Sequence, residues 1–253
     1  MPTSHTPAPG TAHRSSRDRA SRFAATRWSM VLAAGNHRTG TAAHRAMGEL
    51  ACMYWFPLYA YLRRRGSSPP QAEDLVQGFF TRLLEKDALA SVDRSKGKFR
   101  SFLLASLQNY LANEWDKTQT KKRGDGKTTL SLDTLDAETR YAAEPADTMT
   151  PERVYERRWA LAVLEQVLAG LREEYAQRSQ AKIFAALEHL LVGGPRTGYA
   201  QIAQRLQMTE GAVKVAGHRL RRRYRDLLRA EIAQTVAEPA LVDEEIRQLR
   251  ACL

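Results

Sequence analysis

Apolar residues recur three or four positions apart along most of this chain, and few segments alternate with a period of two. This spacing is typical of amphipathic helices, and Gly and Pro fall mainly between the long apolar runs. Ser67 and Ser68 precede a Pro pair, which is a common way for a helix to begin. The pattern predicts helices at residues 26–34, 41–65, 69–86, 99–117, 151–177, 179–192, within 199–229, and at 240–251.

The stretch from Tyr199 to Arg229 predicts two short helices joined by a tight turn. The turn falls at Gln207 and Met208, and Thr209 can accept the exposed amides of the second helix. In a helix-turn-helix the early residues of the second helix face base edges, while later cations meet the DNA backbone. The residues predicted to bind duplex DNA are Thr209, Lys214, His218, Arg219, Arg221, Arg222 and Arg225.

Charge supports this interpretation of the second helix. Between Arg196 and Arg229 there are nine Lys or Arg residues and two acids, a net of +7. The whole chain carries a formal charge of +11, with a pI near 9.9. Such an excess predicts a polyanionic partner and salt-dependent binding. The alternative is a solvated basic helix end that the helix dipole favours, but a solvated helix usually mixes signs.

A second basic region lies between Arg94 and Arg123. It contains eight Lys or Arg residues and only two acids, with aromatic residues interleaved among them. Cations and aromatic rings along one helix suit single-stranded nucleic acid, whose unstacked bases rest on rings. Phe102 is better explained as a core residue. The polar face that carries Asn109, Asn113 and Trp115 is compatible with either role.

We predict an all-α fold of two helical domains joined by a flexible linker, the C-terminal domain being the helix-turn-helix. The predicted parts are a disordered basic tail at 1–25, a helical domain at 26–117, a linker at 118–150, the helix-turn-helix domain at 151–230 and a tail helix at 231–253. Apolar residues in the tail helix suit packing against the last domain better than contact with a regulator.

Composition argues against several other classes of protein. No run of about 18 apolar residues exists, and the polar N-terminus lacks the apolar core of a signal peptide, so we expect a cytoplasmic protein without membrane insertion. The two cysteines and six histidines show no metal-ligand spacing, so we expect no metal and no cofactor. A recombinase or nuclease would need clustered carboxylates or an activated nucleophile, and the acids lie largely in the linker or at helix starts.

A family resemblance rests on three segments, PLYAYLRRRGSSPPQAEDLVQGFFTRLLEK, GKFRSFLLASLQNYLANEW and YAQIAQRLQMTEGAVKVAGHRLRRRYRDLL. In this order, over about residues 26–229, they resemble bacterial RNA polymerase sigma factors of the extracytoplasmic-function class. The resemblance implies an alternative sigma factor, not an enzyme. It would bind core RNA polymerase, recognise promoter DNA as duplex and as melted non-template strand, and direct transcription initiation. The alternative function is a stand-alone helix-turn-helix transcriptional regulator.

The resemblance also implies roles for single residues. The AEDLVQ segment is similar to the helix that docks on polymerase, so its candidate polymerase-binding residues are Glu73, Asp74 and Gln77. The segment from Phe99 to Trp115 is similar to the part that melts DNA and reads the proximal promoter element. Its candidate DNA-binding residues are Lys96, Lys98, Arg100, Asn109, Asn113 and Trp115, with Asn109 and Asn113 near an extruded base. Relatives are often held by an anti-sigma protein, which implies such a regulator as a further partner.

Two glycines depart from the family pattern. Gly78 stands where many relatives carry an acid, and Gly217 replaces a larger apolar residue on the buried stripe of the second helix of the helix-turn-helix. We expect the helices at Gly217 either to approach closely or to pack loosely.

Overall fold

The computed structural model describes residues 41–85, 98–120, 134–142, 149–193, 198–236 and 238–253. Every regular element in these ranges is helical, which confirms the predicted all-α fold. None of these helices is long and apolar enough to cross a membrane. The predicted tail at 1–25, the predicted helix at 26–34 and Lys96 lie outside the described residues.

Most helix bounds agree with the predictions. In chain order the elements are α3 (Thr41–Arg64), α4 (Pro69–Glu85), α5 (Phe99–Thr120), α6 (Thr134–Ala142), α7 (Pro151–Gln177), α8 (Ala181–Leu187), α9 (His189–Val192), α10 (Tyr199–Leu206), α11 (Glu210–Ala233), the 3-10 turn η2 (Pro239–Leu241) and α12 (Val242–Ala251). The start of α7 is fixed by the Thr150 side chain, which accepts from Arg153 N at 3.3 Å, and by Pro151 in the first turn. The predicted helix at 179–192 is divided into two at Glu188.

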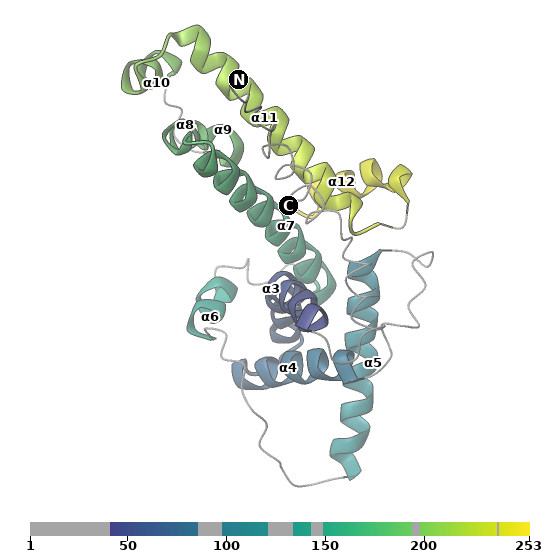
Figure 1. The fold of residues 1–253 in the computed structure, drawn as a ribbon. Coiled ribbons are helices and arrows are strands. Elements are labelled where there is room, and N and C mark those ends of the chain that lie inside the picture. The colour runs from purple at the N-terminus through teal and green to yellow at the C-terminus, as the bar shows by residue number, and fades with distance from the viewer. Residues whose placement is uncertain (1–40, 86–97, 121–133, 143–148, 194–197, 237) are drawn as a thin grey trace, which may run out of the picture.

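The first core surrounds α3, which is buried along Met53–Leu62. Helices α4, α5 and α6 and the first half of α7 pack around it (Figure 1). The end of α11 and helix α12 join the same core through Ile232, Val242 and Leu249. The C-terminal segment of the chain therefore completes the core that the N-terminal helices begin.

The second core lies at the other end of α7. There Leu171 and Tyr175 meet Phe184 of α8, Ile202 of α10 and Leu220 of α11. Helices α7 and α11 lie side by side in opposite directions and link the two cores (Figure 1). Helices α7 and α11, predicted to belong to the C-terminal domain, thus contribute to both cores. The division into domains stays a prediction.

The range predicted as a linker contains ordered structure. Helix α6 falls inside residues 118–150 and buries Ala137 in the first core. Glu138 accepts from Arg63 Nε at 2.8 Å and from the Tyr59 hydroxyl. The Arg63 hydrogen bond holds the pKa of Glu138 below its usual value. Part of this range is therefore fastened to α3 and does not serve only as a connection.

Both unusual glycines lie at close helix contacts. A Cβ at Gly78 would overlap the Tyr110 hydroxyl, so the absence of a side chain lets α5 approach α4. Burial and nearby Glu114 raise the pKa of Tyr110 to about 12. A Cβ at Gly217 would lie 3.0 Å from Leu190 Cδ1, so α11 approaches α9 closely there.

Candidate nucleic-acid and protein interfaces

The basic face of α11 is open to solvent. Its buried stripe of Val213, Gly217 and Leu220 packs into the second core, and this leaves the opposite side uncovered. The residues predicted to bind duplex DNA are all exposed, namely Thr209, Lys214, His218, Arg219, Arg221, Arg222 and Arg225. No described residue forms an ion pair with the four arginines of this set. The face therefore presents cations that can meet phosphate.

The turn before α11 is defined by its hydrogen bonds. Gln207 ends α10 in the left-handed conformation, with φ 52°, and Met208 N donates to Ala203 O at 2.9 Å. The Thr209 hydroxyl then accepts from Ala212 N at 3.2 Å and begins α11. The turn falls where it was predicted, but the second helix has 24 residues and runs past Arg229, so it is longer than predicted; the helix-turn-helix assignment itself stays a prediction.

A second exposed face lies on the later part of α5. Asn109 and Asn113 are one turn apart and exposed, and Asn113 Nδ2 donates to Asn109 O at 2.7 Å. Trp115 is 68% exposed, which is unusual for so large an apolar ring. Phe99, Leu103 and other residues of the opposite side are buried. The last turns of α5 thus expose two amide groups and a large ring, which helical spacing places on different flanks of the exposed side.

The start of α5 differs from the prediction. Lys98 and Arg100 were expected to face DNA, but Arg100 is only 4% exposed. It forms an ion pair with Glu245 of α12, and its guanidinium lies 4.3 Å from the centre of the Trp159 ring. Lys98 Nζ lies 2.8 Å from the same carboxylate. Helix α12 therefore covers these two cations in this conformation.

The candidate protein contact on α4 is accessible. Asp74 is exposed, while Glu73 and Gln77 are partly exposed, and Gln77 Nε2 donates to Glu73 Oε1 at 3.5 Å. The opposite side of α4 buries Ala72, Val76 and other residues in the first core. The three predicted residues thus share a surface that a partner could reach.

Two features of these surfaces were missed from the sequence. Val215 is 50% exposed and stands beside Lys214 on the outer side of α11. It lies off the stripe formed by Val213 and Gly217, and that position was a visible sign of exposure. The part played by Glu245 had no such sign, because its partners lie far away in the chain.

Comparison with protein families finds a match for one part of the chain, the segment that carries α4 and α5. Residues 57–120 match the family model for Sigma-70 region 2. The match runs from the middle of α3 through α4 and α5, so it contains both the α4 surface and the exposed face of α5. It supports a sigma-70 family factor, with a role in RNA polymerase binding and promoter recognition. No curated protein and no solved structure matches the chain.

Proposed function

We propose that this protein is an alternative sigma factor of the extracytoplasmic-function class. It binds core RNA polymerase through α4, melts promoter DNA with α5 and reads a distal promoter element with α11. The observation that carries the proposal is the Sigma-70 region 2 match, because it falls on the helices that present the candidate polymerase and DNA contacts. Such a factor performs no chemistry itself and works in the cytoplasm beside its polymerase.

The proposed melting step uses the exposed face of α5. Asn109 and Asn113 offer paired donors and acceptors to the edge of an extruded base, and Trp115 offers a ring for stacking. Capture of an unstacked base would offset an unpairing cost of about a few kcal/mol. The buried side of α5 already fixes the backbone that carries these residues, so little backbone freedom is lost when the base binds.

The proposed duplex contact uses α11. Arg221, Arg222 and Arg225 meet phosphates, while Lys214, Val215, His218 and Arg219 lie nearer the start of the helix, where base edges are read. In Figure 1 the start of α11 and the end of α5 lie at opposite ends of the molecule. One chain held on one polymerase would therefore contact two separate DNA elements, and the second contact would be effectively intramolecular.

Polymerase binding tests the proposal. Purified core RNA polymerase is incubated with the full chain and with Asp74→Lys, and the retained protein is measured. We expect the variant to bind at least about tenfold more weakly, because a lost charge contact costs roughly 1.4 kcal/mol or more. Glu152→Lys is the matched control, since Glu152 is also an exposed acid near a helix start, on α7.

The alternative function gives a different result in the same assay. A stand-alone regulator would use the open face of α11 without polymerase. Duplex binding by the full chain, with no retention of core polymerase by wild type or Glu152→Lys, would replace the sigma-factor proposal with that reading.

A further inference from the structure

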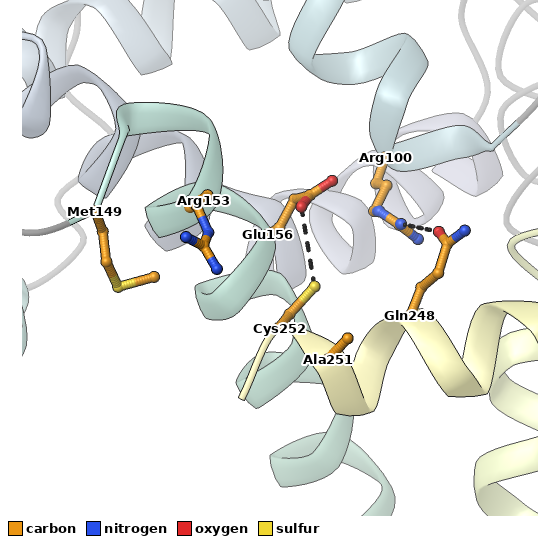
Figure 2. A pocket seen from close by; sticks show the side chains of 7 residues that line it. All are labelled: Arg100, Met149, Arg153, Glu156, Gln248, Ala251 and Cys252. Carbon is orange, nitrogen blue, oxygen red and sulfur yellow. Dashed lines mark hydrogen bonds between the residues drawn. The ribbon is translucent and has the colours of Figure 1, made fainter.

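The C-terminal helix α12 occupies the place where the first turn of α5 would meet DNA. Figure 2 shows α12 beside the start of α5 and the start of α7, with Gln248 directed at Arg100. Gln248 Oε1 accepts from Arg100 Nη2 at 3.0 Å and from Lys98 Nζ. Glu245 is 1% exposed and forms ion pairs with the same two cations. Two residues of one helix therefore engage both cations.

The chemistry of this contact resembles that of a DNA phosphate. A carboxylate and a phosphate both offer anionic oxygens, and Arg recognises either of them. Burial, together with the neighbouring Arg100, lowers the pKa of Lys98. A nearby anion therefore stabilises the charged form of this lysine. A phosphate that approached these two cations would therefore compete with the Glu245 carboxylate for them.

We infer that α12 is an intramolecular competitor of promoter DNA at the start of α5, so that the closed chain holds back its own melting element. The inference rests on the proposed function, because it regulates the DNA contact assigned there to Lys98 and Arg100. In the closed state Glu245 holds both cations. In the open state α12 leaves and DNA phosphate takes its place.

The contact is built in a way that permits release. A buried ion pair contributes little net stability, because removing its charges from water offsets much of their attraction. Exchange of Glu245 for phosphate leaves Arg100 paired, so the costly state with an unpaired buried cation is avoided. Helix α12 has only 10 residues, and helices of this length are marginal in water. It is anchored mainly by Val242 and Leu249.

The end of α12 borders a pocket. A pocket of about 230 Å³ lies where α12, α7 and α5 meet, and its lining includes Arg153, Glu156 and Cys252 (Figure 2). The Cys252 thiol donates to Glu156 at 3.9 Å across this pocket. The last turn of α12 therefore borders an open space, and we place the start of release there.

The test compares Glu245→Gln with wild type for binding to a fluorescently labelled single-stranded oligonucleotide of mixed sequence. The substitution keeps the size of the side chain and removes the competing charge. If about nine molecules in ten are closed, full release tightens apparent binding about tenfold. Glu238→Gln is the matched control, since Glu238 is an exposed acid of the same tail and its loss changes the net charge equally.

A second measurement separates release from damage to the fold. Hydrogen exchange of the full chain is followed with and without the oligonucleotide. We expect residues 242–251 to exchange faster when DNA is bound, while 99–103 become more protected. Adding Arg100→Ala to Glu245→Gln should abolish the gain in affinity, because the freed cation is then missing.

The outcomes are decisive. Equal or weaker binding by Glu245→Gln than by Glu238→Gln, or unchanged exchange in α12 on saturation with DNA, overturns the inference. These results leave the proposed function standing, since polymerase binding is tested on α4, away from α12. Failure of polymerase binding would instead show up in the Asp74 experiment, whatever the behaviour of the tail.

Discussion

The start of α5, with Lys98 just before it, and the middle of α11 both carry closely spaced cations, but only those of α11 are fully open to solvent. Arg221, Arg222 and Arg225 are exposed, whereas Arg100 lies beneath α12 and is paired with Glu245. The same charge pattern in the sequence thus gives one surface that can bind phosphate at once and one that must first be uncovered. Charge along a helix predicts a partner, but exposure decides when that partner can bind.

The largest expected effect is at the contact between Gly78 of α4 and Tyr110 of α5, which holds α5 in place. Gly78→Ala should lower the free energy of unfolding by about 2 kcal/mol, because the new Cβ would overlap the Tyr110 hydroxyl. Urea unfolding measures this change. Tyr110→Phe in the same chain removes the obstructing oxygen and should restore most of the loss. Failure of the double variant to recover would show that the hydroxyl is not the obstacle.

A single arginine can test the open surface. Arg221→Ala should weaken duplex DNA binding about tenfold and reduce the slope of log affinity against log salt by about one. Arg223→Ala is the control on the same helix, since Arg223 Nε lies 2.9 Å from Glu174 and serves the fold. Equal slopes for both variants would contradict the assignment of Arg221 to a phosphate.

The ion pair between Glu138 of α6 and Arg63 of α3 provides a pH test in the first core, to which the covered start of α5 belongs. Arg63 lowers the pKa of Glu138, so this carboxylate stabilises the fold above its unfolded value of about 4.5, and that stability is lost as pH falls through the lower folded value. Glu138→Gln should therefore cost about 1 kcal/mol at neutral pH, or about 2–4 °C in Tm, and little in acid.

The control for this pH test is Glu165→Gln. Glu165 lies on α7, and its exposed side chain pairs with Arg140 of α6. Its Tm should follow wild type at every pH. A deficit for Glu138→Gln that persists in acid would mean that its cause is packing and not charge.

The smallest effect is expected at Gly217 of α11, the helix whose cations are open to solvent. Gly217→Ala places a Cβ 3.0 Å from the flexible end of Leu190, which can shift, while Ala favours the helix by about 1 kcal/mol. The two effects should nearly cancel, leaving the unfolding free energy within about 0.5 kcal/mol of wild type. A loss as large as that of Gly78→Ala would show that both helix contacts are equally rigid.

Much of the fold could be predicted because its signals are local. Thr150 with Pro151, and Thr209 before α11, mark helix starts through side-chain capping and a fixed φ, and both are visible in a few residues. The exposed face of α11 followed from the spacing of its buried stripe. The break at Glu188 was missed, because no Gly or Pro marks it.

The burial of Arg100 could not be predicted in this way. Its partner Glu245 is 145 positions later in a segment, VDEEIRQLRA, whose apolar residues predicted packing against the last domain, whereas α12 packs against the first core. A contact of this kind depends on how α11 returns the chain to the first core, and periodicity within one helix carries no information about it. The same holds for Glu138, which lies in a stretch whose composition indicates a linker.

Transcription from genomic DNA tests the sigma-factor assignment most directly. Core RNA polymerase of the source organism is given fragments of that organism's genome with and without the full chain, and the 5′ ends of the transcripts are sequenced. The account predicts new start sites that share two upstream sequence elements at a fixed spacing, and their loss with Asp74→Lys. Identical start sites with and without the protein would contradict it.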